Sequence, residues 1–188
     1  MPLPKRPFKV VANIPYAITT DIFGKLMDNP NSHFEGGTII TEWGAALKFT
    51  KESQASPRIL SWNTFYEMEI IQKVPKHSFH PPPTVDSALL KIAKRKDPLI
   101  SREQYDGYLS FVAFMLYPHG VLAKNALRKV FTKTQVKRIM KNAGIPRRAL
   151  IQDLSLPQWA HCYHIMQKLI PEAEHPGMPE KFRKAYNM

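Results

Sequence analysis

The stretch Phe8-Lys9-Val10-Val11-Ala12-Asn13-Ile14-Pro15-Tyr16 decides the fold. Its apolar first half is typical of a short strand buried in a parallel sheet. Pro15 has no N–H group to donate to a neighbouring strand, so the strand is expected to end near Asn13. Polar residues therefore stand at the carboxyl end of a strand, which is where open α/β sheets bind ligands.

The residues at this strand end suit one kind of ligand. The side-chain carbonyl of Asn13 and a backbone carbonyl before or within the Ile14-Pro15 pair are acceptors, and together they can receive both hydrogens of an amino group. The ring of Tyr16 can stack on a flat base. Such an amine on a base is a poor nucleophile because its lone pair is conjugated with the ring, and two accepted hydrogen bonds favour its reactive, pyramidal form. The base must leave its stack to reach these groups.

Three further segments follow in order: Glu42-Trp43-Gly44-Ala45-Ala46, Phe79-His80-Pro81-Pro82-Pro83-Thr84-Val85-Asp86-Ser87 and Val130-Phe131-Thr132-Lys133-Thr134-Gln135. Together with Asn13–Tyr16 they resemble the motifs of S-adenosylmethionine-dependent adenine N6-methyltransferases that act on ribosomal RNA. The similarity is greatest to the erythromycin-resistance (Erm) methyltransferases of bacteria. The ordered set covers nearly the whole chain, which makes it far more specific than any one tetrapeptide.

The resemblance implies an α/β fold: the C-terminal part of a Rossmann-like methyltransferase sheet, with two parallel strands and an antiparallel edge hairpin, followed by a small all-α domain. It implies catalytic roles for Asn13, Ile14, Pro15, Tyr16 and Phe79. S-adenosylmethionine is the implied cofactor, bordered by Asn13 and Pro15. The implied substrate is an adenine in 23S ribosomal RNA, whose methylation confers macrolide-type antibiotic resistance.

The family builds its donor site upstream, on a Gly-rich loop, and no G-x-G-x-G segment occurs in this sequence. The chain is therefore expected to be a truncated form that begins at the family's fourth strand and to be inactive by itself. The first strand is then expected to be an unpaired edge, through which the chain self-associates or binds another chain.

Periodicity predicts the remaining elements of the sheet domain. We expect a helix over 19–27, a buried strand over 38–41, and an antiparallel hairpin of strands 65–74 and 85–94. Phe79 in the hairpin loop either stacks on the base opposite Tyr16 or fills the core beneath the loop, and the stiff proline cluster favours stacking. Glu42 either caps the helix that it opens or takes part in catalysis, and its position favours the cap.

A charged linker at 94–98 marks the expected boundary between a partial methyltransferase domain (1–98) and a helical RNA-binding domain (99–170), with a flexible tail at 171–188. Tyr105–Leu116 has helical spacing. Thr132-Lys133-Thr134-Gln135 and Ser155-Leu156-Pro157-Gln158 are capping boxes that open two more helices, the first of which is expected to end at Gly144.

Charge indicates a polyanionic partner. The chain has 27 basic and 15 acidic residues, a formal net charge of +12. Residues 99–188 hold 14 basic and 6 acidic side chains, against 13 and 9 in 1–98. We therefore expect ribosomal RNA, single-stranded or in a hairpin, as the partner. The candidate phosphate contacts are Lys124, Arg128, Lys129, Lys133, Lys137, Lys141, Arg147 and Arg148.

The same composition argues against several other classes. A single cysteine, Cys162, allows no internal disulfide, and no long apolar run predicts a membrane helix, so a cytoplasmic location is expected. The pair His161 and His164 has no second pair of ligands, so no metal site is expected. Two alternative functions stay open: a non-catalytic basic RNA-binding module and a small-subunit ribosomal RNA adenine dimethyltransferase. A DNA adenine methyltransferase is disfavoured by the helical part and the proline-rich loop.

Overall fold

The structure is a computed structural model that describes residues 2–50 and 56–186, and the chain forms two compact units. The first unit comprises residues 1–51 and 62–98. The second comprises residues 52–61 and 99–188. The candidate motifs at 13–16 and 79–87 both belong to the first unit, and the candidate RNA contacts belong to the second.

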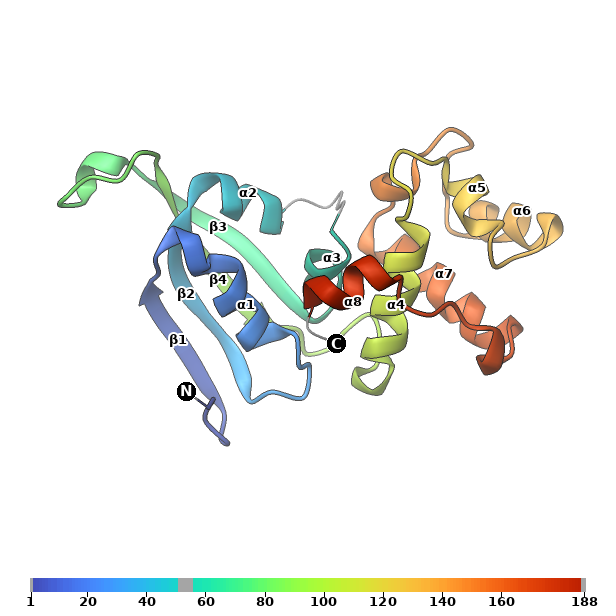
Figure 1. The fold of residues 1–188 in the computed structure, drawn as a ribbon, viewed down its shortest axis with the longest axis horizontal. Coiled ribbons are helices and arrows are strands. Elements are labelled where there is room, and N and C mark those ends of the chain that lie inside the picture. The colour runs from blue at the N-terminus through green and yellow to red at the C-terminus, as the bar shows by residue number, and fades with distance from the viewer. Residues whose placement is uncertain (1, 51–55, 187–188) are drawn as a thin grey trace. The chain divides into compact units, whose positions relative to one another are not determined.

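The first unit is built on a four-stranded sheet with the order β1-β2-β4-β3 (Figure 1). Its strands are β1 (Phe8–Asn13), β2 (Phe34–Glu42), β3 (Tyr66–Val74) and β4 (Ser87–Lys94). β1 runs parallel to β2, whereas β4 runs antiparallel to both β2 and β3. The predicted α/β fold, with two parallel strands and an antiparallel hairpin, is confirmed.

One face of the sheet is buried under helices. Phe23 of α1 (Thr19–Met27) lies 4.7 Å, centroid to centroid, from Phe49 of α2 (Trp43–Thr50). Trp62, on the last turn of α3 (Pro57–Phe65), contacts both rings and donates a hydrogen bond of 2.8 Å to Asp28 Oδ1. Burying three aromatic side chains supplies several kcal/mol, on the order of 2 per side chain, and fixes α1 and α2 on the sheet.

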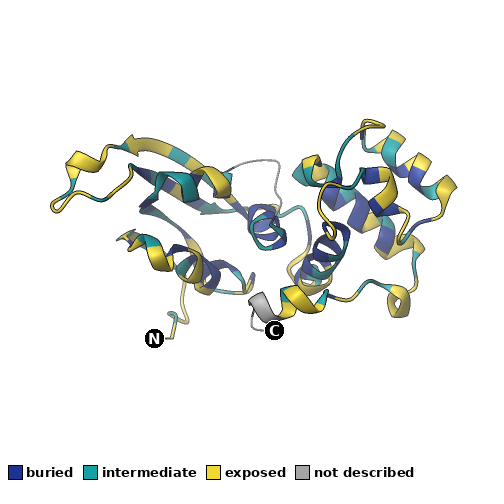
Figure 2. Cartoon of the chain, turned by 45° about the horizontal axis from the view of Figure 1, so that its top comes forward, coloured by how far each residue is buried: buried dark blue, intermediate teal, exposed yellow. Residues whose placement is uncertain are grey.

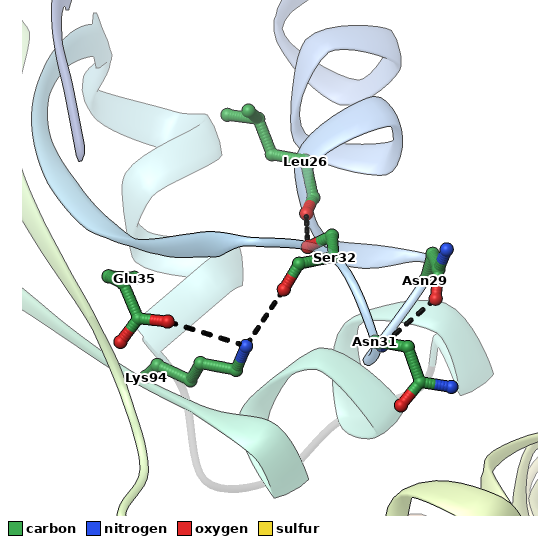
Figure 3. Close-up of polar contacts among 6 residues, drawn as sticks. All are labelled: Leu26, Asn29, Asn31, Ser32, Glu35 and Lys94. Carbon is green, nitrogen blue, oxygen red and sulfur yellow. Dashed lines mark hydrogen bonds and ion pairs between the residues drawn. The ribbon is translucent and has the colours of Figure 1, made fainter. Parts of the chain in front are cut away.

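The turn between α1 and β2 is fixed by polar contacts (Figure 3). The Lys94 ammonium of β4 donates to the Ser32 carbonyl at 2.9 Å and lies 3.7 Å from the Glu35 carboxylate. The Ser32 hydroxyl donates to the Leu26 carbonyl at 3.1 Å. These bonds fix where β2 begins, and so hold the register that places Ile40 beside Asn13.

The opposite face of the sheet is open at β1. Every second side chain of this edge strand is exposed, namely Lys9, Val11 and Asn13, and Val11 is 88% exposed. On β3, Ile71 is 49% exposed. The loop between β3 and β4 is also largely exposed (Figure 2).

The second unit is helical and has an aromatic core. Its helices are α4 (Tyr105–Met115), α5 (Ala123–Leu127), α6 (Lys133–Asn142), α7 (Leu156–Leu169) and α8 (Glu180–Tyr186). Phe111 of α4 packs between Trp159 and Tyr163 of α7, with ring centroids 6.2 and 5.7 Å away. Tyr108 completes the cluster at 5.3 Å from Tyr163. No helix in the described part of the chain is long and apolar enough to cross a membrane.

Both predicted capping boxes are present. At α6, the backbone N–H of Gln135 donates to the Thr132 hydroxyl, and the backbone N–H of Thr132 donates to Gln135 Oε1. α6 gives way to Gly144 at a φ of +62°, a left-handed conformation that glycine adopts easily. At α7, the pair is Ser155 and Gln158.

The C-terminal stretch, for which the sequence predicts a flexible tail, contains helical structure. A 3-10 turn covers Glu172–Glu174, Met178 is buried, and α8 follows. The ammonium of Lys181 lies 3.9 Å from the ring centroid of Tyr117. Residues 187 and 188 of this stretch lie outside the described residues.

Candidate functional site

The five predicted catalytic residues line one cavity of about 330 Å³, together with Pro81 and Pro83. We call it the adenine cavity. Asn13 ends β1, and a 3-10 turn over Tyr16–Ile18 carries the aromatic ring. Phe79 reaches the same cavity from the loop between β3 and β4 and is only partly buried. It therefore does not fill the core beneath the loop.

The backbone of the motif leaves one carbonyl available to a ligand. The Pro15 carbonyl already accepts from the backbone N–H of Ile18 at 3.2 Å and from the hydroxyl of Thr19 at 3.5 Å. No donor in the described part of the chain contacts the carbonyl of Ile14. The Ile14 carbonyl, one of the backbone acceptors that the sequence left open, is therefore free to accept a hydrogen bond from a ligand.

The hydroxyl of Tyr16 is tied to the sheet, a contact that sequence reasoning missed. Tyr16 Oη lies 2.6 Å from Ser87 Oγ, and Ser87 is fully buried at the start of β4. The only signal in the sequence is that Ser87 ends the proline-rich segment. The hydrogen bond holds the tyrosine ring against one wall of the adenine cavity.

This hydrogen bond can be measured by a double-mutant cycle. Tyr16→Phe leaves the buried Ser87 hydroxyl unpaired and is expected to lower the free energy of unfolding by about 1–2 kcal/mol. Adding Ser87→Ala removes that orphaned group, so the double variant should lose less than the two single variants combined, by about 1 kcal/mol. Urea unfolding of the four proteins gives the coupling, and strictly additive losses would contradict the contact.

The loop that carries Phe79 is closed at its base by Asp86. The Asp86 carboxylate accepts from the backbone N–H of Lys76 at 3.0 Å and pairs with the Lys73 ammonium at 2.9 Å. The hydrogen bond from Lys73, followed by that from Lys76, holds the pKa of Asp86 below its usual value. Because the paired carboxylate stays ionised, the clamp is present at neutral pH and is lost only as the pH falls through this lowered pKa.

S-adenosylmethionine fits the described residues only at one border. Asn13 and Pro15 are exposed at the adenine cavity and can contact a donor there. Among residues 2–50 and 56–186, a 3-10 turn follows β1 and helix α2 follows β2, so neither strand leads into a glycine-rich turn. These residues therefore do not form a complete donor site. Nor do they hold a cluster of three metal-ligating side chains.

A second concavity, in the helical unit, gathers six of the eight predicted RNA contacts. This basic groove, of about 790 Å³, lies between α5, α6 and the loop after α6, over the apolar side chains of Val136, Met140 and Ile145. Its cations are Lys124, Arg128, Lys133, Lys137, Lys141 and Arg147. Residues 107–152 contain nine basic and no acidic side chains, so no carboxylate from this stretch offsets the field.

Two predicted RNA contacts do not line the basic groove. Arg148 is exposed outside it. The Lys129 ammonium donates to the carbonyls of Phe114 and Tyr117, near the end of α4, and lies 5.2 Å from the Phe114 ring centroid. Burial lowers the pKa of Lys129. Its role is to satisfy helix-terminal carbonyls, which spacing along the sequence does not reveal.

Lys129 and Lys137 should therefore behave differently. Lys129→Ala removes a cap and is expected to lower the free energy of unfolding by about 1 kcal/mol, with the salt dependence of RNA binding unchanged. Lys137→Ala should leave stability within about 0.5 kcal/mol and reduce the salt slope by about 0.7. Urea unfolding and RNA titrations at several salt concentrations distinguish them, and an equal loss of salt slope in both variants would assign Lys129 to RNA.

Comparison with known proteins places the sequence in one family. The sequence profile described as "Ribosomal RNA adenine dimethylase" matches residues 3–168. An rRNA adenine N-6-methyltransferase of Bacteroides fragilis is 38% identical over 175 residues, which cover 93% of this chain and 65% of that protein. A "Ribosomal RNA small subunit methyltransferase A" of Nostoc punctiforme is 30% identical over 164 residues, covering 82% of this chain and 56% of that protein.

The fold is also similar to a solved structure. The crystal structure of the 23S rRNA methyltransferase ErmE has a TM-score of 0.76 and 25% sequence identity, with 89% of this chain and 68% of that one covered. The chain spans less than two thirds of the length of the Bacteroides fragilis and Nostoc punctiforme proteins. The matched region includes both the adenine cavity and the basic groove.

Proposed function

Because the chain belongs to the ribosomal RNA adenine dimethylase family, we propose that it acts in the N6-methylation of an adenine of 23S ribosomal RNA, as an Erm-type enzyme that confers macrolide resistance. S-adenosylmethionine is the proposed methyl donor, and the cytoplasm is the proposed location. The observation that carries the proposal is the adenine cavity, where Asn13, the Ile14 carbonyl, Tyr16 and Phe79 come together.

The proposed task of these residues is to bind and orient the base. Tyr16 and Phe79 hold the flipped-out adenine between their rings, and base–aromatic stacking contributes about 1–3 kcal/mol per base. Asn13 Oδ1 and the Ile14 carbonyl each accept one hydrogen of the N6 amine. The nitrogen lone pair is then directed away from the ring plane, so positioning and fixed dipoles supply the rate enhancement. The bound donor supplies an electrophilic methyl group.

The basic groove is the proposed binding site for the phosphate backbone of the same RNA. Its six cations pair with phosphates, whereas its apolar floor of Val136, Met140 and Ile145 suits unstacked bases of a single-stranded or hairpin region. Phosphate contacts fix the register of the RNA, and the adenine cavity selects the base.

Calorimetric titration with S-adenosylmethionine tests the catalytic part of the proposal. The chain alone is expected to bind the donor too weakly for catalysis because the described residues contribute only Asn13 and Pro15. The titration is repeated after addition of a 23S hairpin that contains the target adenine. Donor binding in the micromolar range would overturn the expected inactivity. If the chain binds neither the donor nor the hairpin, the proposed function is overturned.

Two other functions are each favoured by one observation. The absence of a Gly-rich turn after β1 or β2 in the described chain favours a non-catalytic RNA-binding module. The similarity to the small-subunit methyltransferase of Nostoc punctiforme favours a small-subunit rRNA adenine dimethyltransferase. Competition between 23S and 16S hairpins tests the second of these: the proposal expects the 23S hairpin to compete at least 10-fold better. The titration with S-adenosylmethionine tests the first.

Self-association through β1 is a further expectation of the proposal. Within residues 2–50 and 56–186, β1 has a paired neighbour only on its β2 side, and its Val11 side chain is 88% exposed. Such an edge recruits another strand, and charged side chains oppose the pairing; β1 carries one exposed lysine, Lys9, to which Val11→Lys adds a second. Sedimentation velocity at high concentration should show dimers, and Val11→Lys should shift the protein to monomers. A wild-type protein that stays monomeric would contradict the expectation.

A further inference from the structure

Another cavity, distinct from the basic groove, lies at the same end of the sheet as the adenine cavity, and the proposed function does not use it. Its volume is about 460 Å³, and we call it the side cavity. Its lining comes from the end of β2, the start of α2 and the loop that carries Phe79. The residues are Glu42, Trp43, Gly44, Lys76, Thr84, Val85 and Asp86.

Register places the two cavities next to each other. Glu42, at the end of β2, pairs directly with Ser87 of β4. Ser87 in turn is hydrogen-bonded at 2.6 Å to Tyr16, which lines the adenine cavity. Paired residues in an antiparallel sheet have Cα atoms about 4.5–5.5 Å apart. The walls of the two cavities are therefore connected through Tyr16, Ser87 and Glu42.

The side cavity has the chemistry of a nucleotide site. Trp43 offers a partly buried indole ring on which a base can stack, and the Lys73 ammonium that pairs with Asp86 lies 5.3 Å from the ring centroid. Lys76 is exposed at the rim, and its ammonium makes no ion pair with the described residues. An aromatic ring beside an exposed lysine matches a base joined to its phosphate.

The two carboxylates of the side cavity are not equivalent. Asp86 is engaged on both oxygens, by Lys73 and by the backbone of Lys76. Glu42 was expected to cap α2, but its carboxylate forms no hydrogen bond with any described residue, so that prediction is wrong. A free, partly buried carboxylate accepts two hydrogen bonds and donates none.

We propose that the side cavity binds the nucleotide next to the target adenine and that Glu42 selects guanine there. Guanine carries two adjacent donors on its Watson–Crick edge, N1–H and the N2 amine, which match the two carboxylate oxygens. Adenine presents an acceptor at N1, and uracil presents acceptors on both sides of its N3–H. The inference rests on the proposed function, because it takes the adenine cavity as the site of the methylated base.

Fluorescence anisotropy with short single-stranded RNAs tests the selection of guanine. Each RNA holds a target adenine flanked by guanine, inosine, adenine or uracil, on the 5′ side in one series and on the 3′ side in another. One series should show guanine preferred over adenine and uracil by about 5- to 100-fold, the discrimination expected of a bidentate contact. Inosine, which lacks the N2 amine, should fall between.

Glu42→Gln should abolish the guanine preference while RNA with adenine at the flanking position binds as before. Glu69→Gln is the matched control, because Glu69 is exposed on β3 and lines neither cavity. The Glu69→Gln variant should keep the guanine preference of the wild type. A guanine preference that survives Glu42→Gln, or one absent in the wild type, would overturn the inference.

One further RNA separates this inference from the proposed function. In it the target adenine is replaced by an abasic site, and guanine is kept. Weaker binding of this RNA with no guanine preference in the wild type overturns the side-cavity inference alone. Equal binding of the adenine and abasic RNAs overturns both, because the adenine cavity would then hold no base.

Discussion

Replacing Lys133, Lys137 and Lys141 together with alanine should weaken binding of a 23S hairpin about 100-fold at 0.1 M salt. The three lysines recur every four residues on the groove face of α6. Each phosphate contact to single-stranded nucleic acid contributes about 0.7 to the slope of log K against log salt concentration. The slope should therefore fall by about 2. Filter binding between 0.05 and 0.3 M salt gives both quantities.

A triple variant of equal charge tests whether the position of the lysines matters. Lys25, Lys48 and Lys96 are exposed and line neither the adenine cavity nor the basic groove. Their replacement by alanine should change the affinity at 0.1 M salt less than 5-fold. Equal losses in the two triple variants would mean that net charge alone drives RNA binding, and the basic groove would lose its role.

Phe79→Ala should reduce the discrimination between an adenine RNA and its abasic analogue by about 5- to 100-fold. The ring is one of the two aromatic walls of the adenine cavity, and stacking on one ring is worth about 1–3 kcal/mol per base. Stability should fall by less than 1 kcal/mol, because Phe79 is only partly buried in an exposed loop. Anisotropy titrations with the two RNAs measure the change.

His77→Ala is the matched control for Phe79→Ala. His77 lies in the same loop, is exposed and does not line the cavity. Its replacement should leave the discrimination within a factor of 2. If Phe79→Ala also leaves the discrimination unchanged, Phe79 does not contact the base.

Local signals predicted much of the fold. At the start of α6, the side chains of Thr132 and Gln135 each accept a hydrogen bond from the other residue's backbone N–H. A capping box of this kind is visible in four residues of sequence. Pro15 ends β1 because it lacks an N–H group, again a property of one residue. The hairpin of β3 and β4 follows from two apolar runs separated by prolines.

Contacts between distant segments were not predictable in this way. Ser87 and Tyr16 are 71 residues apart, and only the sheet brings their hydroxyl groups together. Lys129 stands among groove lysines in the sequence, yet its ammonium reaches the carbonyls of Phe114 and Tyr117 instead. α3 has a weakly periodic sequence, and its place in the core depends on Trp62 reaching Asp28 and the rings of α1 and α2.

The most direct test of the adenine cavity compares two RNAs that differ in one amino group. A 23S hairpin with adenosine at the target position is titrated against the same hairpin with purine riboside, which lacks only the N6 amine. If Asn13 Oδ1 and the Ile14 carbonyl accept the two amine hydrogens, the purine RNA should bind about 5- to 100-fold more weakly, at about 0.5–1.5 kcal/mol per hydrogen bond. Equal affinities would contradict the account.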